Sequence, residues 1–358
     1  MSQLAGSAGK RVRFLAVLTV RNEAAFLLEW LAHHQAVGFT DFLVFSNDCD
    51  DGTDTMLDQL QTLGALHHVR NAGPHDGGVQ WAALKLADRH ALVKSADWIL
   101  ALDIDEFVNI HAGDHTLAAL LSALPDATAI TLTWRLFGNC GIARYADKPV
   151  TEQFVGAAPK IMTWPWRASM FKTFFKTDGV YRKLGIHRPR NPDQDRLDLA
   201  RWFDGCGREL GDRFRRQQLF SPFGRDNYQL VQLNHYALGA MESYVLKCDR
   251  GRAGHSNDAY GMAYWVERNW CLEKDASISA LRDVRNAHLA ELRNDARLSR
   301  LHDAAVVWRK ARFESLLEQE DYRALYGRLL MTPASQPVPP DAARDLHRFA
   351  QKTRNRAD

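Results

Sequence analysis

Two aspartates, Asp103 and Asp105, directly follow the apolar run Trp98–Leu102. A run without a polar break is typical of a strand buried on both faces of a largely parallel sheet. Ligands of open α/β sheets bind just outside the carboxyl ends of the strands, and side chains two apart on an extended chain point the same way. We therefore expect both carboxylates to reach into one crevice, where they would suit magnesium or manganese shared with substrate phosphates. The alternative is that they merely end the strand and begin a loop.

The residues before Asp103 alternate between strand-like and helix-like patterns. This order implies parallel strands joined by right-handed crossovers, so residues 13–110 are predicted to form a nucleotide-fold-like half. No G-x-G-x-x-G or G-x-x-x-x-G-K-[ST] motif follows any of the strands, so neither the dinucleotide fold nor a P-loop is supported. The expected elements are strands at 14–20, 42–45 and 65–69, helices that end at Gly38 and Gly64, and a helix over 79–94.

Polar turns fall at the carboxyl ends of all four strands of this half. Each turn by itself reads as a loop or a helix cap. Because parallel strands end at one edge of the sheet, the four turns together predict one surface that gathers the chemistry. The turns are Arg21–Glu23, Asn47–Asp51, His75–Gly78 and Asp103–Glu106.

The composition is that of an ordinary globular protein. The chain has 358 residues, of which 46% are hydrophobic and 25% charged, and a formal net charge of +3, which is too mild to indicate a nucleic-acid partner. Its five cysteines are scattered and include no C-x-x-C pair, so the sequence indicates neither a disulfide framework nor a zinc site. We expect a cytoplasmic protein without a signal peptide or a membrane span.

Three successive motifs carry a resemblance to a known family. The segments VRNEAAFLLEWLAHHQAVGF, SNDCDDGT and ILALDIDEF resemble those of a GT-A fold glycosyltransferase, from the bacterial branch of family 2 that is similar to family 92. The resemblance implies an α/β fold of the nucleotide-diphospho-sugar transferase type, with a mostly parallel central sheet flanked by helices. It also implies that the first two motifs hold the nucleotide and that the D-x-D motif, Asp103 and Asp105, holds the metal on the diphosphate. The matching nucleotide-binding positions are Val20, Arg21, Asn22, Glu23, Asn47, Asp51 and Asp103.

One of these positions departs from the family pattern. Many family 2 members have an aspartate where Asn47 stands, so contact with the base would have to pass through an amide.

Further matches lie in the second half of the chain. Trp134, Phe137 and Gly138 match a W-x-x-F-G strand, and Lys172 and His187 match a strand and a G-x-H element that close the site. After a strand expected at 229–233, the N-H-Y pattern resembles a family signature whose histidine, here His235, completes the metal site, and a structural histidine is the alternative. Basic residues of the next helix would meet phosphate: Lys247, Arg250 and Arg252.

The general base stays open between three residues. Inversion at the anomeric carbon, which the resemblance implies, needs a group that takes the acceptor proton. Asp178, Glu152 and His187 have suitable side chains, and their spacing selects none of them. Residues 190–227 show no sustained period and are expected to form an insertion or an acceptor-side loop.

The chain beyond the resemblance is predicted to be helical. We expect a helical extension and a Pro-rich, basic, loosely ordered tail, and three roles stay open for them: a packed appendage, a homodimer contact, or peripheral contact with the anionic inner face of a membrane. The predicted divisions are a flexible N-terminus at 1–12, a GT-A domain at 13–258 with halves at 13–110 and 111–258, a helical extension at 259–330, and the tail at 331–358.

The expected function is metal-dependent transfer of a sugar from a nucleotide sugar, UDP-linked, to a hydroxyl group of a glycan or a lipid-linked acceptor, with manganese or magnesium as cofactor. One alternative is a nucleotidyltransferase, which would normally need a glycine-rich loop after the first strand, and Val20–Ala25 contains no glycine. The other is an inactive module that binds sugar nucleotides, against which the intact D-x-D motif argues.

Overall fold

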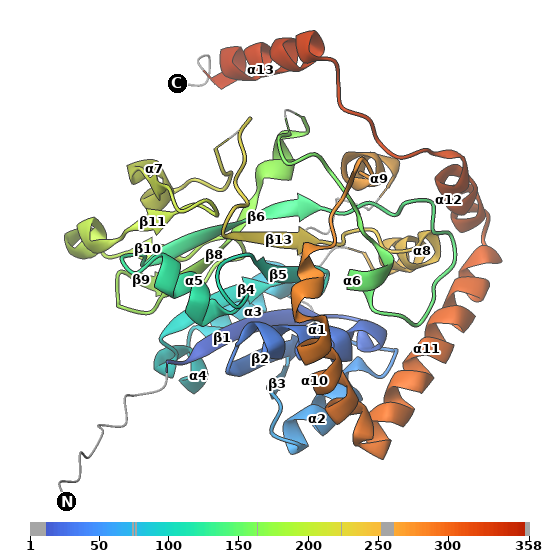
Figure 1. Cartoon of the computed structure of the whole chain (residues 1–358). Coiled ribbons are helices and arrows are strands. Elements are labelled where there is room, and N and C mark those ends of the chain that lie inside the picture. The colour runs from blue at the N-terminus through green and yellow to red at the C-terminus, as the bar shows by residue number, and fades with distance from the viewer. Residues whose placement is uncertain are drawn as a thin grey trace, which may run out of the picture.

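The computed structural model describes residues 12–354, except residues 74, 76, 163, 223 and 252–260. The expected flexible segment 1–12 therefore lies outside the described residues apart from Val12, and so does the phosphate-binding candidate Arg252. Figure 1 shows a central sheet with helices on both sides and the C-terminal helices along one flank.

The amino-terminal half forms the parallel part of the central sheet. Its elements are β1 (Phe14–Val20), α1 (Ala24–Val37), β2 (Asp41–Ser46), α2 (Thr53–Thr62), β3 (His67–Arg70), α3 (Val79–Ala87), α4 (Ala91–Ser95) and β4 (Trp98–Leu102). The strands lie in the order β4-β1-β2-β3, and every pairing among them is parallel. Leu15 and Val17 of β1 enter one apolar cluster and Ala16 and Leu18 enter another. A strand buried on both faces must be apolar throughout, as these runs are.

One predicted helix of this half is wrong in its extent. The helix expected over 79–94 is divided into α3 and α4. His90 adopts an extended backbone conformation, and its ring accepts a hydrogen bond from the backbone N–H of Leu92 at 3.2 Å. This local cap begins a new helix, which helical spacing of apolar residues alone does not reveal.

The second half completes the sheet with mixed pairings. Its elements are β5 (Glu106–Ile110), α5 (Leu117–Ala123), β6 (Ala129–Leu136), α6 (Val150–Gln153), β7 (Gly156–Ala157), the 3₁₀ helix η1 (Trp166–Ser169), β8 (Phe171–Lys176), β9 (Tyr181–Lys183), β10 (Arg190–Pro192), η2 (Gln194–Leu199), β11 (Trp202–Phe203), β12 (Glu209–Leu210), α7 (Asp212–Arg216), β13 (Val231–His235) and α8 (Met241–Arg250). β8 runs antiparallel between β4 and β6, and β13 pairs with both β5 and β6.

The segment 190–227 is more ordered than the expected loop. β11 adds a parallel strand beside β6, and β12 closes an antiparallel hairpin onto it. Trp202 is fully buried, with its ring near those of Phe171 and Tyr181. A strand of two residues is too short to show an alternating pattern, so the sequence could not reveal this edge of the sheet.

The C-terminal part packs on the amino-terminal half. Its elements are α9 (Met262–Arg268), β14 (Glu273–Lys274), η3 (Ser277–Leu281), α10 (Arg282–Asn294), α11 (Ala296–Leu317), α12 (Glu320–Met331) and α13 (Pro340–Arg354). α10 and α11 lie against α1, and α11 also contacts α2 (Figure 1). α1 is therefore covered by the sheet on one side and by helices on the other, which explains why nearly all of its residues are buried.

The basic end of the chain, expected to be loosely ordered from residue 347 onward, is helical as far as residue 354, where the described residues end. This segment is part of α13, which follows an extended stretch (Figure 1). Two pairs at i and i+3, Asp341 with Arg344 and Asp345 with Arg348, link successive turns of this helix. Such pairs stabilise a helix by a few tenths of a kcal/mol each.

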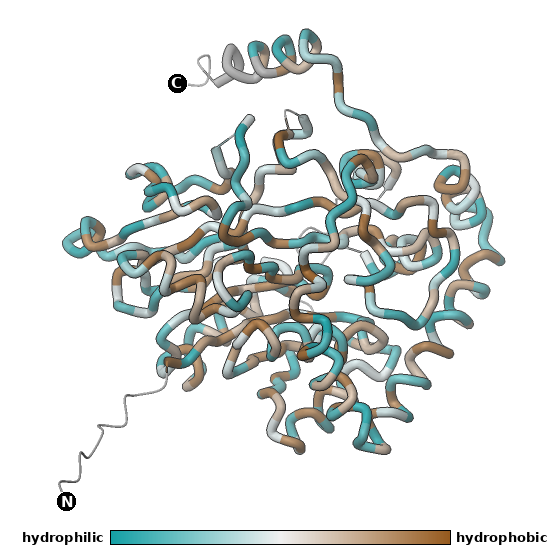
Figure 2. Tube along the Cα trace, in the orientation of Figure 1, coloured by the Kyte–Doolittle hydropathy of each residue, from teal (hydrophilic) through white to brown (hydrophobic). Residues whose placement is uncertain are grey.

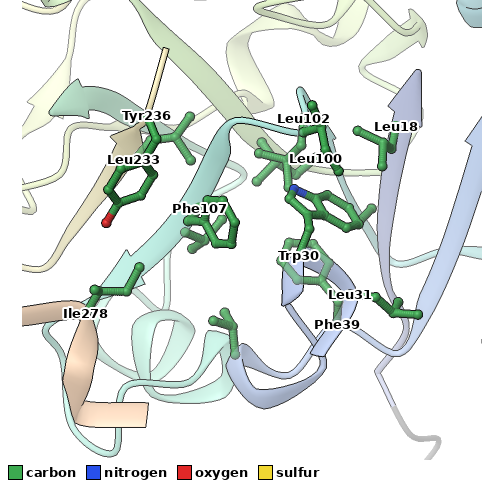
Figure 3. Packing of buried hydrophobic residues seen from close by; sticks show 14 of the residues in the cluster. Leu18, Trp30, Leu31, Phe39, Leu100, Leu102, Phe107, Leu233, Tyr236 and Ile278 are labelled. Carbon is green, nitrogen blue, oxygen red and sulfur yellow. The ribbon is translucent and has the colours of Figure 1, made fainter. Parts of the chain in front are cut away.

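The core lies between the sheet and α1. Trp30 of α1 is 1% exposed, packs with Leu18, Leu100 and Leu102, and donates a hydrogen bond from its indole N–H to the carbonyl oxygen of Glu106 at 3.1 Å (Figure 3). Figure 2 shows apolar residues concentrated along the central strands and polar residues along the outer helices and loops. The predicted α/β class, with a mostly parallel central sheet flanked by helices, is confirmed. None of the helices in the described ranges has the length and apolar character needed to cross a membrane.

Candidate active site

The D-x-D motif lies in a tight turn between β4 and β5. The chain is not extended there, because the backbone N–H of Glu106 donates to the carbonyl oxygen of Asp103 at 3.1 Å. The carboxylate of Glu106 accepts the backbone N–H of Asp103 at 2.9 Å and closes the turn from the other side. Asp103 and Asp105 nevertheless line the same cavity, so the expected convergence is found for a different geometric reason.

This cavity has a volume of about 440 Å³ and lies at the carboxyl ends of β1, β2 and β4. We call it the main cavity. Its wall combines residues of the first turn, the second turn and the D-x-D turn with residues from β13, α8 and α9. The predicted site and motif residues that line it are Val20, Arg21, Glu23, Asn47, Asp103, Asp105, Trp134, His187, His235, Lys247 and Arg250.

Asp103 is held by one residue of β8 and one of α3. Its Oδ2 pairs with the ammonium group of Lys172 at 2.9 Å, and its Oδ1 accepts a hydrogen bond from Gln80 at 2.9 Å. The Lys172 side chain is 1% exposed, and its Nζ also lies 3.4 Å from the carboxylate of Glu106. A buried lysine between two carboxylates stays charged, and the two carboxylates hold its pKa above the ordinary value although burial opposes them.

Glu106 is fully buried behind the turn. Its Oε1 accepts the indole N–H of Trp134 at 2.6 Å. Burial raises the pKa of Glu106 to about 8, although the Lys172 ammonium opposes the shift. Glu106 therefore positions Asp103 and Trp134 from behind and does not face the main cavity.

Asp105 is held by a different set of elements. Its Oδ2 pairs with Lys247 of α8 at 2.7 Å, and its Oδ1 lies 3.8 Å from Nε2 of His235 at the end of β13. Burial alone would raise the pKa of Asp105, but Lys247 and His235 hold it well below the usual range. Burial lowers the pKa of His235 to about 3, against the attraction of Asp105, so the imidazole is neutral.

The predicted metal ligands do not form a ready trio. Over the described ranges, no three His, Cys, Asp or Glu side chains converge closely enough to hold an ion. Asp105 and His235 fit a divalent cation in chemistry and spacing, because two ligands about 2.1 Å from one ion lie up to roughly 4.2 Å apart. His235 is a neutral imidazole whose Nδ1 has no hydrogen-bond partner among the described residues. Each carboxylate oxygen of Asp103 already has one partner, Lys172 or Gln80, and a carboxylate oxygen has a second lone pair that could bind an ion.

The first two turns meet at the main cavity. Arg250 of α8 pairs with Glu23 and donates to the carbonyl oxygen of Arg21 at 2.9 Å, which ties the first turn to α8. Asn47 is 3% exposed; its amide N–H donates to Asp48, while its Oδ1 has no partner within the described residues. An amide carbonyl on the cavity wall is an acceptor ready for a ligand N–H.

Two predicted nucleotide-binding residues do not line the main cavity. The Oδ1 of Asn22 accepts the backbone N–H of Asp50 at 2.7 Å, which joins the first two turns. Asp51 is 5% exposed, and its carboxylate accepts the backbone N–H groups of Ala24 and Thr53, both at 2.9 Å. Its place is at the starts of α1 and α2, so the geometry favours the structural alternative for Asp51.

Comparison with known families identifies the chain. Residues 16–200, slightly more than half of the chain, match glycosyltransferase family 92. The chain belongs to glycosyltransferase family 92. This membership and the mixed sheet agree with the GT-A fold that the motifs predict.

The relatives of this family 92 chain are distant and longer. A family 92 protein of rice, Oryza sativa subsp. japonica, is 27% identical over 153 residues, covering 40% of this chain and 25% of that protein. One of Ricinus communis is 24% identical over 144 residues, covering 36% of this chain and 24% of that protein. The chain thus spans about a quarter of the length of these relatives.

Two solved structures are similar in outline. The S. aureus TarS 1–349 structure has a TM-score of 0.35 at 12% identity and covers 79% of this chain and 74% of that one. The galactosyltransferase LgtC, in complex with donor and acceptor sugar analogs, has a TM-score of 0.32 at 14% identity and covers 76% of this chain and 95% of that one.

Only one of the three base candidates of this family 92 chain lies at the main cavity. His187 lines it, and its Nδ1 lies 3.1 Å from the carbonyl oxygen of Phe171. Asp178 follows β8, whose end pairs with Trp98 at the start of β4, so it lies at the opposite edge of the sheet from Asp103. Glu152 pairs with Arg285 and Arg282 beneath α10. Asp178 and Glu152 therefore lie away from the main cavity, whereas a general base must reach the reacting hydroxyl.

The sequence analysis did not predict several other residues of the main cavity. Arg268 of α9 is 7% exposed, and its guanidinium carbon lies 3.7 Å from the centre of the Tyr264 ring. Both line the main cavity, together with Gln80 and Trp81. α9 lies outside the resemblance, and no motif marks it. Only the packing of α9 beside α12 and α8 brings it to the site.

Proposed function

We propose that this family 92 protein transfers a sugar from a UDP-linked donor to a hydroxyl group of a glycan or a lipid-linked acceptor, with inversion at the anomeric carbon. The observation that carries the proposal is the main cavity, which joins the D-x-D carboxylates, a neutral histidine and several basic side chains on one wall. Its volume of about 440 Å³ lies within the usual range for ligand sites. The proposal includes membership of the bacterial branch of family 2 that is similar to family 92.

The proposed nucleoside position is the edge formed by the first two turns. Val20, Arg21 and Asn47 line this part of the main cavity. The Oδ1 of Asn47 has no partner in the described chain, so it would accept the N–H of a base such as uracil. An aspartate there would accept the same hydrogen bond, which makes the amide a conservative departure from the family pattern.

The proposed diphosphate position lies beside α8 and α9. Lys247, Arg250 and Arg268 line this side of the main cavity, and their positive charges complement two phosphates. Asp105 and His235 would hold manganese or magnesium, with the other ligands supplied by Asp103 and the diphosphate. When bound, such an ion neutralises part of the charge that develops on the leaving diphosphate.

His187 is the proposed acceptor-side base. A carbonyl oxygen can only accept, so the Nδ1 of His187 carries the proton that it donates to Phe171, and Nε2 keeps its lone pair. Burial and the Lys172 ammonium lower the pKa of His187 to about 4, so the ring is neutral at neutral pH. Nε2 is thus the atom that would take the proton of the acceptor hydroxyl.

We also propose that the domain boundaries predicted from the sequence correspond to functional parts of the chain. The GT-A domain would be residues 13–258, with the helical extension at 259–330 and the last segment at 331–358. α9 lies within the extension and carries Arg268 to the main cavity, so the extension would contribute to donor binding as well as to packing.

The first experiment measures ligand-dependent stability. Manganese with UDP at a hundredfold excess over Kd should raise the free energy of unfolding by about 2.7 kcal/mol. Asp105→Asn should abolish this gain, because it removes the charge that holds the cation. Asp178→Asn, at the opposite edge of the sheet, is the matched control and should keep the full gain. An undiminished gain in Asp105→Asn would contradict the proposed metal site. In a separate experiment, a screen of nucleotide sugars for hydrolysis by the wild-type protein would identify the donor.

A second variant separates a ligand from a packing residue. His235→Gln should weaken the apparent affinity for manganese, measured in the presence of UDP, by at least tenfold. The residues around the site cannot replace a ligand that is lost from the ion. The melting temperature without ligands should stay near that of the wild-type protein. A lowered ligand-free melting temperature with an unchanged manganese titration would assign His235 to the core.

A further inference from the structure

A second, smaller pocket adjoins the main cavity on the other side of the D-x-D turn. It has a volume of about 70 Å³ and lies between α1, α8 and α11. We call it the Arg309 pocket. Its wall is mostly aromatic and aliphatic, and the residues that the argument uses are Phe26, Phe107, Leu246, Trp308 and Arg309.

Arg309 is the unusual member of this wall. It is 5% exposed, and its guanidinium carbon lies 4.5 Å from the centre of the Phe26 ring and 5.0 Å from that of Tyr145. Over the part of the chain that is described, the guanidinium makes no hydrogen bond and no ion pair, and its Nε is buried without a partner. A guanidinium presents five N–H donors, and leaving the buried one at Nε without a partner is costly.

The other charges around the Arg309 pocket already have partners. Glu23 pairs with Arg250, Asp105 with Lys247 at 2.7 Å, and Asp249 with Arg312 at 2.8 Å. In each of these three pairs the positive and negative charges balance each other. The charge of Arg309 has no such counterpart among the described residues, so a ligand of this pocket would balance it.

Two further carboxylates act on Arg309 from a distance. Asp51 accepts the backbone N–H of Ala24 at 2.9 Å, and Glu242 accepts that of Tyr145 at 2.8 Å. Both raise the pKa of the guanidinium, yet burial outweighs them and lowers it. Neither carboxylate supplies the direct contact that a buried cation needs.

We propose that the Arg309 pocket is a binding subsite for a carboxylate group. One unpaired cation calls for one negative charge, and the planar fork of a guanidinium matches the two oxygens of a carboxylate. The volume exceeds the roughly 30 Å³ that one water molecule occupies in the liquid. The apolar wall suits the carbon atoms attached to a carboxylate better than it suits a bare, fully hydrated ion.

The carboxylate has two chemical sources, a free small organic acid or an acidic sugar of a larger substrate. Asp105 and Lys247 line both the Arg309 pocket and the main cavity, so a group bound here would touch the D-x-D turn from behind. The binding claim does not depend on the proposed sugar transfer, because it is tested with the carboxylate alone.

The test compares melting temperatures of the full chain in sodium acetate, sodium propionate, sodium glucuronate and sodium chloride at equal ionic strength. We expect a saturable rise with the carboxylates that exceeds the rise in chloride. A larger effect of acetate and propionate assigns the pocket to small acids, whereas a larger effect of glucuronate assigns it to an acidic sugar. Equal rises in chloride and in all three carboxylates would overturn the proposal.

Substitutions in α11 test whether the carboxylate-dependent rise in melting temperature arises from the Arg309 pocket. Arg309→Gln should weaken the apparent affinity for the carboxylate at least tenfold, and Arg309→Lys, which keeps the charge without the fork, should weaken it less. Arg300→Gln removes one charge from the exposed side of the same helix and should leave the affinity unchanged. If Arg309→Gln does not fold, Arg309→Lys and the wild-type salt series decide the outcome. An affinity equal to that of the wild type in Arg309→Lys and Arg309→Gln would contradict the subsite.

Discussion

Two clusters of interacting polar and charged side chains in this molecule use the same chemical groups in different surroundings. Each combines carboxylates and basic side chains with histidine, yet the space beside the first is about 440 Å³ and the space beside the second is about 10 Å³. The cavity cluster consists of Asp103, Asp105, Lys172, His187, His235 and Lys247. The interface cluster, where α1 and α6 meet α10, consists of Glu29, His33, Thr151, Glu152 and Arg285.

The interface cluster is closed by its own hydrogen bonds. Glu29 accepts the backbone N–H groups of Val150 at 2.8 Å and Thr151 at 3.2 Å, and the Thr151 hydroxyl donates to it at 2.8 Å. Arg285 then bridges Glu29 and Glu152. The network joins three segments of the fold, and the pocket beside it has a volume of only about 10 Å³. A cluster of titratable groups therefore indicates a functional site only where it also borders a cavity large enough for a ligand, and the interface cluster borders only this small pocket.

The largest expected effect breaks the interface cluster. Arg285→Met should lower the free energy of unfolding by about 3 kcal/mol, because it leaves the buried Glu29 without its cation. Urea denaturation followed by circular dichroism measures this. Arg282→Met, whose side chain is 52% exposed and 3.6 Å from Glu152, is the matched control and should cost less than about 1 kcal/mol. Equal losses in the two variants would show that the interface cluster is not a structural unit.

The second prediction separates the two clusters by activity. His187→Gln should lower kcat by about a hundredfold, because the proposed base is lost from the main cavity. Glu152→Gln should leave kcat near the wild-type value once the folded fractions are equal. Initial rates with a saturating donor measure both. A large loss in Glu152→Gln with none in His187→Gln would exchange the roles of the two clusters.

The third prediction concerns acid stability and the interface cluster. Burial lowers the pKa of His33 to about 4, although its hydrogen bond with the Val108 carbonyl opposes the shift. Between pH 6.5 and 4 the folded state therefore binds fewer protons than the unfolded state, so the free energy of unfolding falls as the pH falls through this window. One such group contributes at most about 1.4 kcal/mol per pH unit. Above pH 6.5 it contributes no slope.

His33→Gln tests whether His33 causes this loss of stability in acid, with the free energy of unfolding measured by urea denaturation at several pH values. The variant should lose stability less steeply than the wild type between pH 6.5 and 4. Some slope should remain, because burial also lowers the pKa of the neighbouring His34. Identical slopes in the two proteins would show that His33 is not the group that titrates.

The smallest expected effect concerns the end of the chain, far from both clusters in sequence. Arg309 is buried and Arg312 is paired with Asp249, whereas Lys310 on α11 and Arg344 and Arg348 on α13 are exposed. Each basic residue near an anionic surface contributes about 1 kcal/mol, and the pairs Asp341–Arg344 and Asp345–Arg348 reduce this. A chain that ends at Met331 should bind anionic vesicles more weakly at low salt and keep its melting temperature. Sedimentation at low and high salt measures this, and equal sedimentation of both chains would exclude α13.

Local sequence pattern was sufficient for the central strands of the first half of the fold, although it missed the break between α3 and α4. The apolar runs that became β1, β2 and β4 could be recognised because a strand covered on both faces has to be apolar throughout. The position of each polar turn then follows from the end of its strand, which is why Asp103, Asp105, Asn47 and Glu23 were expected at one edge. His235 was found through a motif and not through its spacing.

The pairing of these residues with their partners required the tertiary structure. Lys172 meets Asp103 across 69 residues and Lys247 meets Asp105 across 142. The antiparallel direction of β8 places Lys172 and His187 beside the main cavity and sends Asp178 to the opposite edge. α10 and α11 cover α1, and this packing buries Arg309 of α11 against the ring of Phe26. Sequence periodicity reports which face of a segment is buried, whereas the partner of that face depends on the order and direction in which distant segments pack.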